Sequence, residues 1–177
     1  KIGRLILHIM DYRVLLHLFL QFKYKKENQN KLDKLSIEVG SQEEVFVTIT
    51  FAKPIDDTKL NKFIQDYKLN VKHAIVRSTE KGTNLRGTLL MKPEASGTFE
   101  KQSMDEIHQL LTGNQATFKG FIELVATVPN SQLKALTADQ LVFLADPSAD
   151  DHFVSNAKNE YMPGVFWNLE DTNMVSE

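Results

Sequence analysis

The segment from Phe118 to Ser148 constrains the fold most, because it encodes a strand, a short helix and a second strand without a long loop. Apolar residues alternate along residues 118–128, which is typical of a strand with one buried face. Pro129 and Asn130 then predict the end of that strand and the cap of a helix, and residues 141–145 return to a strand pattern. Gly120 lacks a side chain within the first strand, which predicts a bulge or a close contact there.

Three further strands are predicted upstream of that segment. Residues 45–51 alternate between two faces, and residues 71–77 and 85–91 form a pair joined by a turn that contains Gly82 and Asn84. The side chains expected on the buried face of the first of these strands are Val45, Val47, Ile49 and Phe51.

Two helices are predicted between these strands. Asp56 or Asp57 can cap the first, and Ser103 with Glu106 matches a capping box at the start of the second, which is expected to end at Gly113. The buried stripe of the first helix is expected to consist of Leu60, Phe63, Ile64 and Tyr67. The element order is β-α-β-β-α-β with a further α-β unit. It predicts an α+β fold with a ferredoxin-like antiparallel sheet, helices on one face and an N-terminal apolar helix.

The most apolar part of the chain is residues 5–22, which follow Lys1 and Arg4. A charged start and an apolar body are typical of a signal or anchor segment. However, Asp11 and Arg13 would each cost about 2.5–3.5 kcal/mol at a bilayer centre, and no small-residue cleavage motif follows. Three interpretations stay open: a helix packed against the body or a second copy, a targeting or anchor remnant, and an irregular segment.

The chain is expected to have three parts. Residues 23–44 are polar and predict a connector, so residues 1–44 comprise the N-terminal apolar helix and this connector. An α+β domain is expected over residues 45–148. Residues 149–177 are expected to form an acidic C-terminal arm that contains aromatic residues.

That arm supplies the candidate binding residues. The only tryptophan of the chain lies there, and Pro163 and Gly164 precede it. Such aromatic side chains either pack the arm against the protein's own domain or bind a partner. Packing against its own domain is the favoured interpretation. The binding residues predicted on this basis are Tyr161, Phe166 and Trp167.

The net charge of −2 hides an asymmetry that bears on partners. Residues 1–34 carry eight basic and three acidic side chains, whereas the rest of the chain carries 13 basic and 20 acidic ones. Binding of nucleic acid needs a basic face that releases counterions from phosphates. We therefore expect no nucleic-acid partner. A protein partner or self-association is expected, and membrane contact through residues 5–22 stays open.

The sequence lacks the motifs of most common enzyme classes. The absence of cysteine excludes disulfides, zinc–thiolate sites and cysteine nucleophiles. No Gly-x-Ser-x-Gly elbow, dinucleotide glycine loop or phosphate-binding loop occurs, and no His pair has zinc-hydrolase spacing. His73 and His108 are interpreted as ordinary surface or half-buried residues. We expect no catalytic residue and no cofactor.

The densest cluster of possible metal ligands is interpreted as a solvated acidic turn. It lacks the alternating acidic positions, central glycine and closing glutamate of a calcium loop, although oxygen ligands at short spacing could hold Ca²⁺. We therefore predict no metal site there. The members of the cluster are Asp146, Asp150, Asp151 and His152.

One family resemblance is carried by three short motifs. Residues 118–121 read Phe-Lys-Gly-Phe, residues 131–136 form a short helix with a Leu-x-x-Leu core, and residues 141–146 form a strand that ends in Asp. Together they resemble the closing half of the subtilisin-type propeptide and protease-inhibitor family, over about 30 of 177 residues. The resemblance implies a small ferredoxin-like fold, secretion and a role as an inhibitor or chaperone of a subtilisin-like protease.

The function expected from the sequence is that of a non-enzymatic binding or interaction domain. Its expected place is the cell envelope or the exterior, since a chain without cysteine is compatible with secreted bacterial proteins; a cytoplasmic location is the alternative. The expected binding surfaces are the sheet face without helices and the arm around Trp167. A stand-alone inhibitor or chaperone of a subtilisin-like protease is the alternative function.

Overall fold

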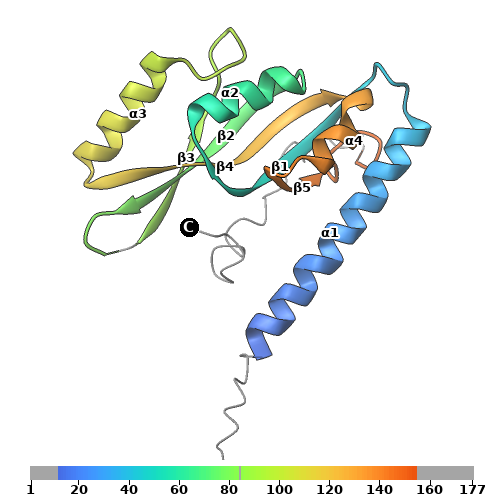
Figure 1. Cartoon of the computed structure of the whole chain (residues 1–177), viewed down its shortest axis with the longest axis horizontal. Coiled ribbons are helices and arrows are strands. Elements are labelled where there is room, and N and C mark those ends of the chain that lie inside the picture. The colour runs from blue at the N-terminus through green and yellow to red at the C-terminus, as the bar shows by residue number, and fades with distance from the viewer. Residues whose placement is uncertain (1–11, 84, 155–177) are drawn as a thin grey trace, which may run out of the picture.

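A computed structural model describes residues 12–83 and 85–154 of the chain, and Figure 1 shows their arrangement. Five strands form one antiparallel sheet in the order β3-β2-β4-β1-β5. The predicted α+β class, with one antiparallel sheet and an N-terminal helix, is confirmed. The elements in chain order are α1 (Tyr12–Glu38), β1 (Glu44–Ile55), α2 (Asp57–Asp66), β2 (Asn70–Glu80), β3 (Arg86–Met91), α3 (Lys101–Gly113), β4 (Ala116–Pro129), α4 (Asn130–Ala138) and β5 (Val142–Asp146).

Two helical crossovers each join parallel strands that are separated by one antiparallel strand. β4 lies between β1 and β2, which α2 connects, and β2 lies between β3 and β4, which α3 connects. Such split β-α-β units belong to the ferredoxin-like pattern. In a ferredoxin-like sheet the second strand of the hairpin would lie beside β1; here β3 is an edge strand, and β4 and β5 flank β1. The split crossovers are therefore present, while the ferredoxin-like strand order is not confirmed.

The main core lies between one face of the sheet and the helices α2, α3 and α4, which Figure 1 shows on the same side. The alternation predicted for β1 is confirmed, because Val45, Val47, Ile49 and Phe51 are all fully buried. They pack with Leu60, Phe63 and Ile64 of α2, and Tyr67 is half-buried at the end of that helix. Asp56 caps α2 as predicted, since its Oδ1 accepts a hydrogen bond of 2.8 Å from the Lys59 amide.

The predicted start of α3 is wrong. α3 begins at Lys101 behind Glu100, whose side chain makes no capping hydrogen bond, so Ser103 lies within the first turn. The loop before it explains the earlier start. The Phe99 amide donates to Asn61 Oδ1 at 2.9 Å, and Asn61 Nδ2 donates to the Phe99 carbonyl oxygen at 2.8 Å. This double hydrogen bond and the burial of Phe99 hold the start of α3 against α2.

The connector predicted over residues 23–44 is also wrong for its larger part. α1 continues to Glu38, and Leu32, Leu35 and Val39 belong to the main core. Their spacing of three and four residues is that of a buried helical stripe, which the surrounding polar residues concealed. Asn130 Nδ2 donates to the Leu35 and Val39 carbonyl oxygens at 3.2 and 2.8 Å, and so holds the end of α1 against α4.

The other end of α1 runs past the edge of the sheet, as Figure 1 shows. Leu20 and Phe22 are exposed there, with 52% and 59% of their surface open to solvent. No helix in the part of the chain that the structure describes is long and apolar enough to cross a membrane. Residues 1–11, which include the start of the predicted apolar segment, lie outside the described residues, as does Asn84 of the predicted turn.

The glycine prediction in β4 is confirmed. The pairing of β2 with β4 shifts register on both sides of the pair Arg77–Gly120, and Gly120 has a φ of +130°. A Cβ atom on Gly120 would lie 2.8 Å from the Ile55 carbonyl oxygen. Only a residue without a side chain fits where β1 comes this close to β4.

Candidate functional site

The second face of the sheet is turned away from the core helices, and we call it the helix-free face. Helices α2, α3 and α4 lie on the other side, and α1 reaches only its β5 end, where Lys25 Nζ lies 4.4 Å from the centroid of the Phe143 ring (Figure 1). Cross-strand pairs define its rows, because directly opposed residues lie on the same face of a sheet. One row is Ile75–Glu123–Thr50, and the next is His73–Val125–Thr48. The face comprises Phe46, Thr48, Thr50, His73, Ile75, Arg77, Leu90, Ile122, Glu123, Val125, Thr127, Phe143, Leu144 and Asp146.

The centre of the helix-free face is buried and carries charge. Arg77 is 1% exposed and Glu123 is 5% exposed, and Thr50 and Val125 are fully buried. Arg77 Nη1 donates to the Gly87 carbonyl oxygen at 3.4 Å. Burying charged groups costs free energy that a well-packed apolar face would not cost. This face is therefore chemically unlike the core side of the same sheet.

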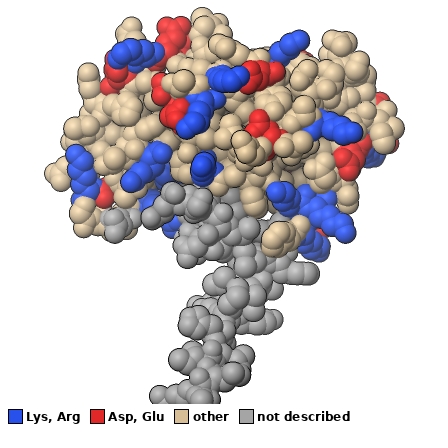
Figure 2. Space-filling model, viewed as in Figure 1, with Lys and Arg blue, Asp and Glu red and all other residues tan. Residues whose placement is uncertain are grey.

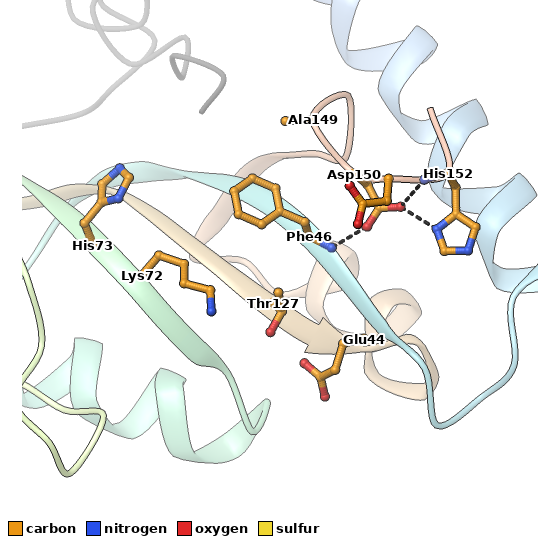
Figure 3. Close-up of a pocket in the computed structure, with 9 residues that line it drawn as sticks. Glu44, Phe46, Lys72, His73, Thr127, Ala149, Asp150 and His152 are labelled. Atoms are coloured by element: carbon orange, nitrogen blue, oxygen red, sulfur yellow. Dashed lines mark hydrogen bonds and ion pairs between the residues drawn. The ribbon is translucent and has the colours of Figure 1, made fainter. Parts of the chain in front are cut away.

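A hollow of about 680 Å³ lies at one end of the helix-free face (Figure 3). Strands β1, β2 and β4 contribute one part of its lining, and the loop after β5 contributes the rest. In Figure 3 the ring of Phe46 lies between His73 on β2 and Asp150 on the loop. The lining residues are Glu44, Phe46, Lys72, His73, Thr127, Ala149, Asp150, Asp151 and His152.

Asp150 fixes the loop to the sheet. Its Oδ2 accepts a hydrogen bond of 2.6 Å from the Phe46 amide, and its Oδ1 accepts one of 3.0 Å from the His152 amide. The same Oδ1 lies 2.5 Å from His152 Nδ1, so the carboxylate also orients the imidazole. Asp150 is 3% exposed, whereas the His152 side chain is 40% exposed. One wall of the hollow is therefore rigidly attached to β1.

Asp146 has a separate structural role on the other side of this loop. Its carboxylate accepts hydrogen bonds from the Tyr24 hydroxyl of α1 and, at 2.8 Å, from the Ser148 amide. Burial raises the pKa of Tyr24, and the hydrogen bond to Asp146 raises it further. Lys31 Nζ donates to Ser148 Oγ at 2.5 Å, which adds a second link between α1 and the loop.

The solvated acidic turn predicted for this segment is wrong for two of its members. Asp146 and Asp150 are both buried, because each carboxylate satisfies backbone amides of the loop and the sheet. Asp151 and His152 are the exposed members. Within residues 12–83 and 85–154, no group of three or more His, Asp or Glu side chains could hold a metal ion.

His73 contributes a neutral side chain to the hollow. This residue is half-buried, as the sequence predicts, and burial lowers its pKa, with the nearby Lys92 lowering it further. His73 is therefore a neutral imidazole at neutral pH, able to donate one hydrogen bond and accept another. With Lys72 and Glu44 nearby, the lining offers both signs of charge, a neutral ring and the aromatic ring of Phe46.

The nearest approach to catalytic machinery is the pair of Asp150 and His152. An aspartate that orients a histidine is part of the arrangement that activates a hydroxyl nucleophile. Thr127 supplies the one side-chain hydroxyl among the lining residues, and no hydrogen bond joins it to His152, although both lie within the described part.

The predicted binding residues and the observed hollow lie in different parts of the chain. Tyr161, Phe166 and Trp167 are outside the described residues. Asp150 and His152 were singled out from the sequence for a different role. Sequence reasoning missed Phe46, Lys72 and Thr127, because a side chain on the less apolar face of a strand gives the same pattern whether it faces water or a ligand.

Elsewhere the described surface carries charges of both signs. Figure 2 shows Lys and Arg side chains interspersed with Asp and Glu over the visible face. Several basic side chains form ion pairs with neighbours on their own helix, such as Lys62 with Asp66 and Lys101 with Asp105. Charges of opposite sign therefore lie close together on this surface.

Comparison with known proteins gives no family for this chain. Neither a scan of protein-family models nor searches of curated proteins and of solved structures find a match. Any functional conclusion therefore depends on the geometry of the helix-free face and its hollow.

Proposed function

We propose that the protein is a non-enzymatic binding domain of the cell envelope or exterior, which receives a segment of a protein partner on its helix-free face. The observation that carries the proposal is the hollow of about 680 Å³ beside Phe46. Its volume falls within the range of roughly 300–1,000 Å³ that is typical of ligand pockets. The hollow lies on a sheet whose other face packs against the main core.

The lining favours a peptide segment as the ligand. An aromatic side chain of a partner can stack on Phe46, and aromatic anchors contribute most of the binding energy in many protein interfaces. His73, Lys72 and Glu44 can pair with polar and backbone groups on either side of such an anchor. Because Asp150 fixes the wall of the hollow, little conformational entropy is lost when a ligand binds.

The compartment and the oligomeric state form part of the same proposal. A chain without cysteine is suited to an oxidising exterior, since it offers no thiol for unwanted disulfides. Leu20 and Phe22 at the projecting end of α1 provide a second apolar contact, for self-association or for contact with a membrane surface. Residues 5–22 would extend that contact.

Selection from a displayed library of random peptides tests the proposed function. The full-length protein is immobilised, and we expect enrichment of peptides that contain an aromatic residue. Phe46→Ala should weaken a selected peptide by about tenfold or more, because it removes the aromatic wall of the hollow. Lys72→Glu should change the selectivity toward charged peptides.

The matched control is Lys62→Ala on α2, whose side chain is 73% exposed on the opposite side of the sheet. It should leave peptide binding unchanged. Circular dichroism of each variant shows whether the fold is kept. The proposal is contradicted by a library that yields no enriched peptide, or by folded Phe46 and Lys72 variants that bind the selected peptides like the wild type.

The alternative function is that of a stand-alone inhibitor or chaperone of a subtilisin-like protease. It is supported by the resemblance within residues 118–146, where β4, α4 and β5 form the strand–helix–strand unit that the resemblance requires. Titration of subtilisin activity with the purified protein separates the two functions. Inhibition at micromolar concentration or below supports the alternative, and unchanged protease activity at that concentration removes it.

A further inference from the structure

We propose that the outer edge of β3 is a second binding surface, which takes an extended, acidic segment of a protein partner as a further strand of the sheet. β3 is the last strand on its side of the sheet, and within the described part it pairs with β2 alone. Extended peptides bind to open sheet edges in this way: main-chain hydrogen bonds give affinity, and alternate side chains give specificity. The edge lies apart from the hollow, so its assignment does not rest on the proposed function.

The two edges of the sheet differ in what lies beside them. α1 packs along β5, where the Tyr24 hydroxyl donates to the Asp146 carboxylate (Figure 1). At the other edge Thr88 and Leu90 of β3 are exposed, and Leu90 has 53% of its surface open to solvent. Natural proteins cover or charge their edge strands against unwanted pairing. The β5 edge is thus covered by a helix, whereas the β3 edge presents exposed side chains.

The register of β2 with β3 shows which backbone groups of β3 point outward. The Glu80 amide donates to the Leu85 carbonyl oxygen at 2.8 Å, and from there the register runs through β3 without a shift. In an antiparallel ladder, residues bonded to the neighbouring strand alternate with residues whose N–H and C=O groups point the other way. Every second residue of β3 therefore turns both backbone groups away from β2. These residues are Arg86, Thr88 and Leu90.

The side chain of Leu90 provides an apolar contact for the added strand. Leu90 opposes Ile75 on the helix-free face, and Ile75 packs against Ile122 in a small apolar cluster. Directly opposed side chains on neighbouring strands contact each other. An apolar side chain opposite Leu90 on the partner segment would therefore extend this cluster across the edge.

Lys92 provides a positive charge two residues further along the same side. It directly follows β3, is exposed, and lies close enough to His73 to lower the pKa of that imidazole. Pro93 comes next and favours an extended backbone at Lys92. Side chains on one face of a strand are two positions apart. The edge therefore fits a segment with a carboxylate two residues from its apolar side chain.

Charge favours such a segment over a second copy of this chain. Residues 81–92 contain three basic side chains and no acidic one, so two copies paired edge to edge would bring like charges together. The nearest carboxylates bond within their own loops. Glu80 Oε2 accepts a hydrogen bond of 2.5 Å from the Thr83 hydroxyl, and Glu94 Oε2 accepts one of 3.1 Å from the Glu100 amide.

Peptide selection tests the edge apart from the hollow when the full-length wild type and Phe46→Ala are both immobilised. We expect both to enrich peptides with Asp or Glu two positions from Val, Ile or an aromatic residue. Thr88→Pro should weaken these peptides about tenfold or more, because proline removes an outward N–H and keeps the bonds to β2. Thr88→Ala retains that N–H and should bind them like the wild type. Lys92→Glu should weaken them about fivefold.

Hydrogen exchange of the wild type gives a readout that does not depend on the folding of a variant. In the free protein the Thr88 and Leu90 amides should exchange fast, because they point away from β2. The Leu89 amide, which bonds to β2, should exchange slowly. A selected peptide should slow the exchange at Thr88 and Leu90 and leave Leu89 as it was.

Three results would overturn the proposal. The first is a pair of selections without any peptide that protects the Thr88 amide, and the second is a folded Thr88→Pro variant that binds the peptides like Thr88→Ala. The third is a wild-type dimer in sedimentation that Thr88→Pro abolishes, since a second copy would then occupy the edge.

The same variants separate this edge from the proposed function. Peptides that Phe46→Ala weakens and Thr88→Pro does not would leave the hollow and remove the edge. Peptides with the reverse pattern would leave the edge and remove the hollow. Circular dichroism of each variant shows that its fold is kept.

Discussion

The two faces of the sheet differ in what covers them and in what they bury. The core side is covered by α2, α3 and α4 and buries side chains such as Val47 and Ile49. The helix-free face buries Thr50, Arg77 and Glu123 with no described helix above them. A fold selected for stability alone gains nothing from burying charges. The comparison teaches that one face supplies most of the apolar burial, and the other is the surface that we propose for recognition.

The largest expected loss of stability comes from truncating a side chain on the core side, and it can be compared with a truncation on the helix-free face. Phe63→Ala should lower the free energy of unfolding by about 3–5 kcal/mol, because Phe63 is 2% exposed and packs its ring against Phe51 at 5.4 Å. Ile122→Ala should cost about 2 kcal/mol, since the described members of its cluster besides itself are only Ile75 and Phe143. Urea denaturation measures both. An equal or larger loss for Ile122→Ala would break the comparison.

A loss of stability between these two values is expected where the backbone shapes the helix-free face. Gly120→Ala should cost about 2–3 kcal/mol, because the new Cβ meets the Ile55 carbonyl oxygen and the backbone has a positive φ. Gly97→Ala is the matched control, with a φ of +79° but no atom within 4 Å of the new Cβ. It isolates the cost of the conformation, about 1 kcal/mol. Equal losses in denaturation would mean that the close approach of β1 does not matter.

The smallest expected effect is a pH dependence on the core side. The Tyr67 hydroxyl donates to Asp139 Oδ2 at 2.7 Å, and burial together with this carboxylate raises the pKa of Tyr67 to about 12. The folded protein holds this proton more tightly than the unfolded chain, whose tyrosine has a pKa near 10. Its contribution is thus complete below pH 10 and is lost as the pH rises toward 12.

Stability measured from pH 9 to 12 checks this prediction. The wild type should lose more stability over that range than Tyr67→Phe, which cannot ionise. Parallel losses would show that the hydrogen bond to Asp139 does not survive in solution.

Local patterns made one face of the sheet predictable. The alternation of residues 45–51, the stripe of α2 and the Asp56 cap each depend on neighbours in the sequence, and all three are confirmed. Leu32, Leu35 and Val39 also have helical spacing, but the polar residues between them led us to predict a connector in place of a helix. The start of α3 was missed because a contact with Asn61, distant in the sequence, sets it.

The candidate site was much less predictable than the core. The hollow brings together Phe46, His73, Thr127 and Asp150, which no local pattern connects. Strand order decides that β4 lies beside both β1 and β2, and the sequence contains no local signal for that order. The sequence placed Asp150 and His152 in one cluster. It could not predict that the buried Asp150 carboxylate accepts a hydrogen bond from the Phe46 amide and so holds the loop on the sheet.

The most direct test of the account compares the wild type with Phe46→Ala in binding a peptide that was selected on the immobilised protein. We predict that Phe46→Ala binds the peptide about tenfold more weakly or worse, because Phe46 lines the hollow on the helix-free face. Lys62→Ala, on the other side of the sheet, should bind like the wild type. Equal affinities of the wild type and a folded Phe46→Ala variant would contradict the claim that this face is the recognition surface.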